Sequence, residues 1–137
     1  MKLVLDSNII VAAYAGRGLC NSLFELCLDR YSIIISDFIL AEVYRTLNNK
    51  LKMPPKNVQI IIDYLKEFCD LTAYTKLNES ICRDKNDNDI IALAISNNVD
   101  YLITGDKDLL ILKKYKKVKI ISPREFWLIV KGNNQRQ

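Results

Sequence analysis

Short apolar segments alternate with helical segments along nearly the whole chain, and this alternation restricts the possible folds more than any other feature. Five segments have the composition of short strands: 3–5, 31–35, 71–74, 101–104 and 118–121. Strands that are apolar on both faces are typical of parallel sheets covered by helices on both sides. We therefore expect an α/β fold with three layers, α/β/α, around a mostly parallel central sheet of about five strands.

Helices are expected between these strands, where apolar residues recur every three or four positions. Ser36 or Asp37 can cap the helix after the second strand, and Pro55 can be the first residue of the next helix. The segment 90–95 is apolar on every side, which is typical of a helix buried within a domain. We expect Asp87 to cap this buried helix.

No linker or internal repeat divides the 137 residues, so we expect one domain over residues 1–130 and a polar, disordered tail over residues 131–137. The apolar runs are too short to span a bilayer, and the apolar start of the chain stops at Asp6, unlike a secretory signal. The four cysteines form no Cys-x-x-Cys pair, which favours buried thiols over a disulfide framework. These features predict a cytoplasmic protein.

The chain contains no histidine, and this absence excludes several kinds of catalysis. A Ser-His-Asp triad, a histidine general acid or base, and any zinc site with histidine ligands all require that residue. The four scattered glycines form none of the Gly-rich loops that bind phosphates. Chemistry must therefore depend on carboxylates, hydroxyls, amines or thiols. The net charge of +4 permits a polyanionic partner without requiring one.

Acidic residues follow two of the expected strands and open the buried helix. Asp6 ends the first strand, Asp106 follows the strand at residues 101–104, and Asp87 precedes the segment 90–95. Ligands of open parallel α/β sheets bind beyond the carboxyl ends of the strands, so these carboxylates are expected to converge. A hard divalent cation such as Mg²⁺ or Mn²⁺ would neutralise their repulsion. Such an ion can activate water and stabilise charge on a phosphate.

Each acidic residue also has a purely structural explanation. Asp6 and Asp87 could simply cap the helices that follow them, because aspartate is a favoured capping residue. Glu42 lies off the apolar face of its helix, three residues before Arg45, so a solvent-exposed ion pair is the simplest interpretation of its position. Turn or cap roles near helix starts are equally open to Asp84, Asp89, Asp106 and Asp108.

The acidic segment 83–89, with the sequence RDKNDND, does not fit a calcium-binding loop. If Asp84 is the first position of an EF-hand loop, Asp89 occupies the sixth, which requires glycine, and Ile95 the twelfth, which requires glutamate. The segment 6–8 reads Asp-Ser-Asn, whereas a phosphatase of the haloacid dehalogenase type needs Asp-x-Asp after its first strand. Both interpretations are therefore poor.

Four segments, in this order, resemble the motifs of the PIN domain family: LVLDSNIIVAA, SDFILAEVYRTL, DNDIIALAIS and DYLITGDKDLL. The likeness extends to about Phe126, and Ser7 stands where the family usually has threonine. The segment RDKNDND is similar to one in a subgroup of toxin-like members, although Lys85 replaces their proline. Any single motif would be weak, but four in order at whole-domain spacing are a strong signal.

The resemblance implies an endoribonuclease that depends on Mg²⁺ or Mn²⁺, with Asp6, Glu42, Asp87 and Asp106 as its catalytic and metal-binding residues. Asp6 and Asp87 would be the nearest ligands, Asp106 a ligand directly or through water, and Glu42 a ligand or a residue that positions water. Supporting roles would fall to the neighbouring residues Ser7, Asn8, Thr104, Asp84, Asp89 and Asp108.

The resemblance also implies partners: an RNA substrate, a cognate antitoxin in a toxin–antitoxin system, and a second copy of the chain. Arg45, Lys107 and Lys113 are candidates for RNA contacts, since a nuclease needs cations beside its acidic site to hold backbone phosphates. A PIN-like module that binds RNA or protein without cutting is the main alternative. A metal-dependent phosphatase of small substrates is another.

Overall fold

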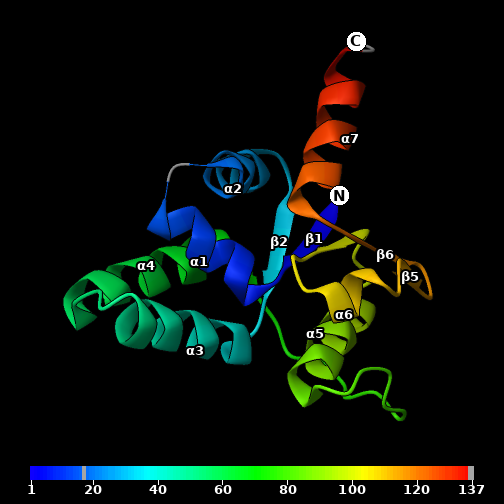
Figure 1. The fold of residues 1–137 in the computed structure, drawn as a ribbon, viewed down its shortest axis with the longest axis horizontal. Coiled ribbons are helices and arrows are strands. Elements are labelled where there is room, and N and C mark those ends of the chain that lie inside the picture. The colour runs from blue at the N-terminus through cyan, green and yellow to red at the C-terminus, as the bar shows by residue number, and fades with distance from the viewer. Residues whose placement is uncertain (17, 136–137) are drawn as a thin grey trace.

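The computed structural model describes residues 1–16 and 18–135, with side chains described as far as residue 132. Helices lie on both sides of a central sheet (Figure 1). The strands are β1 (Lys2–Leu5), β2 (Ser32–Ile35), β3 (Asp70–Leu71), β4 (Tyr101–Ile103), β5 (Lys114–Tyr115) and β6 (Val118–Ile121). The helices are α1 (Ser7–Ala15), α2 (Leu19–Arg30), α3 (Asp37–Arg45), the π-helix η1 (Thr46–Lys50), α4 (Pro55–Phe68), α5 (Lys85–Ser96), α6 (Lys107–Leu110) and α7 (Pro123–Gln135).

The sheet has six strands in the order β3-β2-β1-β4-β6-β5, and every neighbouring pair is parallel except β5 and β6. The expected α/β/α fold with a mostly parallel sheet is therefore confirmed. The sixth strand, β5, has only two residues and was not expected, because LKKYKK carries no apolar run. β1 lies between β2 and β4, with Leu5 in register with Ile103. The residues that follow β1 and β4 consequently emerge side by side.

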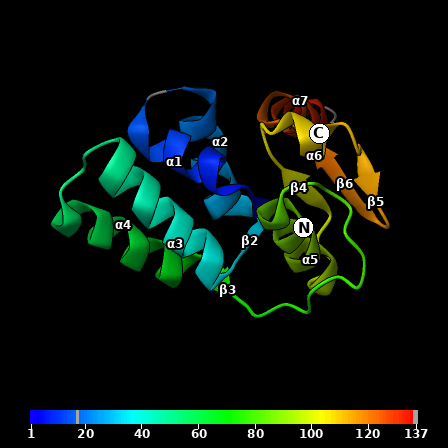
Figure 2. The same ribbon diagram turned by 60° about the horizontal axis from the view of Figure 1, so that its bottom comes forward.

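Burial explains why the central strands are apolar on both faces. Leu3, Val4 and Leu5 are at most 1% exposed, since helices cover the sheet on each side. In Figure 2, α3 and α4 lie on one side of β2, and α5 lies on the other side of the sheet. The apolar run of α5 is buried, as its sequence predicts, and α5 contacts both β1 and β4. This packing fixes the start of α5 close to the ends of those two strands.

Two expected helix starts are confirmed. The Ser36 side chain accepts a hydrogen bond from the Ile39 backbone N–H (3.5 Å), and Pro55 is the first residue of α4. The helix that begins at Asp37 is a regular α-helix only as far as Arg45, and the chain then continues as the wider π-helix η1.

Helix α7 continues to Gln135, beyond the domain limit at residue 130 and into the segment expected to be a disordered tail. Residues 136 and 137 lie outside the described part of the chain. No helix among the described residues is long and apolar enough to span a membrane. All four cysteines, at positions 20, 27, 69 and 82, are free thiols.

Candidate metal centre and active site

Asp6 and Asp106 meet at the carboxyl edge of the sheet through Thr104. The Asp6 backbone N–H donates to the Ile103 carbonyl oxygen (3.0 Å), which aligns the ends of β1 and β4. The Thr104 hydroxyl donates to Asp6 Oδ2 (2.8 Å) and accepts from the Asp106 backbone N–H (3.0 Å). Thr104 is fully buried, so both of its hydrogen bonds are protected from water. It therefore fixes the first acidic residue relative to the second.

Asp6 is the residue before α1, but its side chain makes no capping hydrogen bond. Its carboxylate instead accepts from Thr104 and, at 3.5 Å, from the Ser7 hydroxyl. Asp6 therefore stands at the N-cap position of α1, as its place in the sequence allows, but its side chain does not cap the helix.

Ser7 connects Asp6 to Glu42. Its hydroxyl lies 2.8 Å from Glu42 Oε2 and 3.5 Å from Asp6 Oδ1, and its side chain is buried. Glu42 is half-buried on α3 and lines the same cleft as Asp6. Its carboxylate therefore points toward the acidic residues. Helical spacing alone could not distinguish this position from one in a surface ion pair.

The expectation that Asp87 caps α5 is wrong. Asp84 is the N-cap, and its side chain accepts from the Asn86 backbone N–H (2.9 Å). Asp87 lies inside the first turn and is only 8% exposed. The physical reason is that α5 begins at Lys85, five residues before its apolar run starts at Ile90. Asp84 therefore satisfies the helix terminus, which leaves the Asp87 carboxylate available for the site.

Asn88 holds the segment that leads into α5, a role that the sequence did not predict. Its side-chain oxygen accepts from the backbone N–H groups of Ile81 (2.8 Å) and Cys82 (2.9 Å). Its amide group donates to the Cys82 carbonyl (2.9 Å) and to the Asp84 carbonyl (3.3 Å). Asn88 thereby fixes the chain on both sides of Arg83. The only signal in the sequence was a polar residue one position before Asp89.

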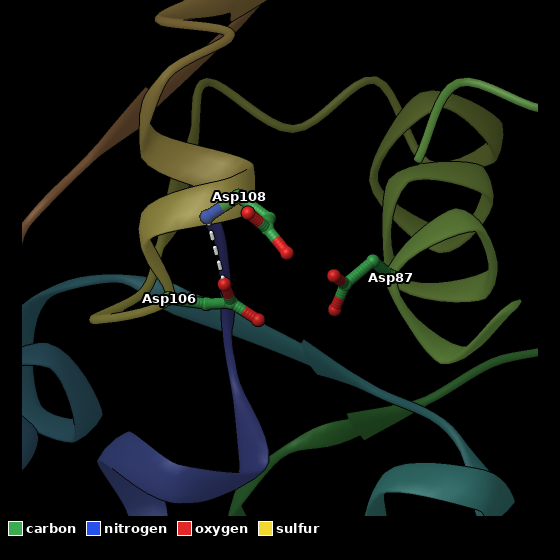
Figure 3. Close-up of side chains that lie close together, drawn as sticks. All are labelled: Asp87, Asp106 and Asp108. Carbon is green, nitrogen blue, oxygen red and sulfur yellow. Dashed lines mark hydrogen bonds between the residues drawn. The ribbon is translucent and has the colours of Figure 1, made fainter. Parts of the chain in front are cut away.

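Three carboxylates converge above the sheet edge: those of Asp87, Asp106 and Asp108 (Figure 3). One oxygen from each lies within 4.8 Å of the others. Asp106 is also the N-cap of α6, because its Oδ1 accepts from the Asp108 backbone N–H (2.8 Å). Asp108 was expected to have only a supporting role, because its position in the sequence is equally compatible with a turn or a helix cap.

Asp87 Oδ2 is buried and has no hydrogen-bond partner among the described residues. Burial, and then the charges of Asp106, Asp84 and Asp6, raise the pKa of Asp87 to about 7. Burial also raises the pKa of Asp6, although its hydrogen bond from Thr104 opposes that shift. An orphaned buried oxygen beside two more carboxylates fits the oxygen donor set that Mg²⁺ or Mn²⁺ prefers. The residues present therefore fit a hard divalent cation.

The raised pKa of Asp87 predicts that the metal-free protein loses stability as pH rises. The unfolded chain releases this proton near the ordinary pKa of 3.8, and the folded chain only near 7, so deprotonation favours unfolding between those values. Urea unfolding in EDTA should show the free energy of unfolding falling over that window. The fall should be smaller in Asp87→Asn, and equal pH profiles for parent and variant would contradict the assignment.

Thr104 offers a second test of the site's internal support. Thr104→Val keeps the shape but removes both hydrogen bonds, so we expect unfolding free energy to fall by about 1–3 kcal/mol. Thr104→Ser retains the hydroxyl and should lose less. Urea denaturation of the three proteins gives the comparison. A valine variant as stable as the parent would show that the link between Asp6 and Asp106 contributes nothing.

Asp87 and Asp106, but not Asp108, line a cleft of about 380 Å³ whose walls come from α1, α3, η1, α5 and the end of β4. Of the candidate site residues, the cleft is lined by Asp6, Ser7, Asn8, Glu42, Arg45, Asp84, Asp87 and Asp106. Asp89 does not line it and lies beside Tyr74, whose pKa is raised by burial and by that carboxylate. Lys107 and Lys113 are exposed but are not lining residues.

The fold and site together define an α/β domain with an acidic centre at the carboxyl edge of a parallel sheet. The sequence matches the profile of the PIN domain over residues 2–108, and the chain belongs to the PIN domain family. Among solved structures, it resembles a chain from the crystal structure of VapBC2 from Rickettsia felis bound to a DNA fragment from their promoter. The TM-score is 0.58 at 17% identity, covering 89% of this chain and 98% of that chain. No curated protein matches the chain.

Proposed function

We propose that this PIN domain is an endoribonuclease that uses Mg²⁺ or Mn²⁺ to hydrolyse RNA phosphodiester bonds. The observation that carries the proposal is the buried Asp87 oxygen, which has no partner in the described part of the chain and lies beside Asp106 and Asp108. A carboxylate is left without a partner in a folded protein at a cost, and such sites are commonly functional. Histidine is absent from the sequence, so a metal supplies the most direct route to phosphodiester hydrolysis.

Asp87 and Asp106 would hold the metal, with Asp6 and Asp108 beside them. When bound, the ion would lower the pKa of water in the site and stabilise negative charge on the phosphate in the transition state. Thr104 orients the Asp6 carboxylate through its hydrogen bond. The N-cap bond from Asp108 to Asp106 fixes one Asp106 oxygen and leaves the other directed toward Asp87 (Figure 3).

Glu42 has the position of a residue that orients the attacking water. Ser7 holds one of its oxygens at 2.8 Å, and the residue lines the cleft beside Asp6. A carboxylate there can accept a hydrogen bond from water and can take up its proton. Ser7 and Asn8 lie at the start of α1 on the same wall, where they can support Asp6 or contact a substrate phosphate.

The proposal is tested by incubating purified protein with single-stranded RNA in Mg²⁺ or Mn²⁺. Cleavage at internal positions that stops with EDTA is the expected result. RNA binding without cleavage would favour the non-cutting module, and turnover of p-nitrophenyl phosphate without action on RNA would favour a phosphatase. Either outcome would overturn the assignment as a ribonuclease.

We also propose that the chain is the cytoplasmic toxin of a toxin–antitoxin pair. The toxin-like motif RDKNDND and the likeness in fold to a VapBC2 chain support this role. Expression without an antitoxin should arrest growth, and Asp6→Asn should relieve the arrest. Continued growth with the parent protein expressed would count against a toxin.

Self-association is a further proposal, for which α4 offers the exposed residues Ile60, Tyr64 and Phe68. Light scattering tests it.

A further inference from the structure

The cleft is lined by basic residues as well as acidic ones, and of the basic ones only Arg45 has been considered, as a candidate RNA contact. One side of the cleft carries Asp6 and Asp106, which follow β1 and β4, and Asp84 and Asp87 at the start of α5. The opposite wall comes from α3 and η1, which contribute Glu42, Arg45, Thr46 and Lys50 to the lining. Arg45 and Lys50 are exposed, and Thr46 is half-buried. The wall therefore changes from a carboxylate to two cations along one helical segment.

The π-helix explains how Lys50 stays on this wall. In a continuous α-helix, a residue eight positions after Glu42 would be rotated from it by about 80°. The chain instead forms the wider π turn after Arg45, with the Leu51 backbone N–H donating to the Thr46 carbonyl, five residues earlier (3.1 Å). Because the π turn has more residues per turn, the four steps from Thr46 to Lys50 cover less than a full rotation. This offsets part of the rotation of Lys50 away from Glu42. Glu42, Thr46 and Lys50 therefore line one cleft.

The spacing along the wall suits successive phosphates of one strand. At the rise of an α-helix, Arg45 lies about 4.5 Å beyond Glu42 along the axis. Lys50 follows the wider π turn and lies less than about 12 Å beyond Glu42, a length that an extended strand covers in a few nucleotides. A metal held by the acidic centre would neutralise the phosphate there, but the neighbouring phosphates would need other cations. Arg45 and Lys50 are the basic residues among those that line the cleft.

Burial of Asp87 favours a single strand over a duplex. Asp87 is 8% exposed, so a phosphodiester reaches it only if the backbone bends into the cleft. Duplexes resist such bending, whereas a single strand adapts easily. We propose that Arg45, Thr46 and Lys50 form a phosphate-binding track that holds single-stranded RNA on one side of the scissile bond. This inference rests on the proposed ribonuclease activity and names the substrate form and its contacts.

The test compares Lys50→Gln with Lys56→Gln, a matched charge change at an exposed position of α4 outside the cleft. On a labelled single-stranded RNA, Lys50→Gln should raise KM about tenfold with kcat nearly unchanged, and should lower the slope of log KM against log salt by about one. Lys56→Gln should change neither quantity. Equal effects of the two variants, or equal cleavage of duplex and single strand by the parent, would overturn the track.

An uncharged methylphosphonate placed at each nucleotide near the cut locates the contact. One position, a few nucleotides from the cut on one side, should raise KM for the parent but have no further effect in Lys50→Gln. Additive effects at every position would contradict the proposal.

If no RNA is cleaved, fluorescence anisotropy with the same RNA in EDTA still measures RNA binding by the track. Weaker binding by Lys50→Gln than by Lys56→Gln then supports the track, although the proposed ribonuclease activity is wrong. Equal binding by the two variants refutes the track by itself.

Discussion

Asp87→Asn is expected to reduce RNA cleavage by at least about 100-fold, because it removes the charge of the most buried member of the acidic cluster. An amide occupies the same space but is a poor ligand for Mg²⁺ or Mn²⁺. The substitution should not harm the fold, since Asp87 makes no capping bond and its Oδ2 has no partner among the described residues. Initial cleavage rates, with a melting curve for each protein, measure both effects.

Asp89→Asn provides the matched control on the same helix. Asp89 is half-buried and does not line the cleft, so its substitution should leave the cleavage rate within about threefold of the parent. A cleavage rate for Asp87→Asn equal to that of the parent, in a preparation free of contaminating nuclease, would show that the active site lies elsewhere.

Phe126→Ala is expected to lower the free energy of unfolding by about 3–5 kcal/mol. Phe126 is fully buried, and its ring makes edge contacts with Tyr31 and Tyr101 at centroid distances of 5.9 and 5.4 Å. These contacts join α7 to the sheet, although the match to the PIN domain ends at residue 108. Urea unfolding measures the loss.

Leu128→Ala serves as the control, because this leucine lies on the same helix and is 60% exposed. It should change stability by no more than about 0.5 kcal/mol. A small loss in Phe126→Ala would mean that α7 is not integral to the domain, and the proposed domain limit at residue 130 would then have to move toward residue 108.

The layout of the fold could be predicted because its determinants are local. Strands such as β1 are uniformly apolar, and the acidic residues follow them directly, so the convergence of Asp6 and Asp106 depends only on parallel pairing. Buried α5 was identifiable from an apolar run with no polar face. Glu42 was identifiable only from the resemblance to the PIN domain family, because its direction is set by Ser7, a residue 35 positions earlier in the chain.

Several details depend on geometry that sequence patterns do not carry. Asp84 and Asp87 are both suitable caps, and the choice between them depends on the backbone geometry of the preceding segment, which Asn88 fixes. The closeness of Asp108 to Asp87 results from the tertiary arrangement, which brings the starts of α5 and α6 to the same edge of the sheet. The π turn after Arg45 has no simple sequence signature and was missed for that reason.

Titration of the metal-free protein with Mn²⁺ in a calorimeter tests the central claim most directly, since the claim is that these carboxylates hold a divalent cation. The parent should bind with a measurable heat, and Asp87→Asn should bind at least about tenfold more weakly. The binding should also release protons near pH 7, because the pKa of Asp87 lies at about 7 before the ion enters. A parent protein that binds no Mn²⁺, or a variant that binds it equally well, would contradict the account.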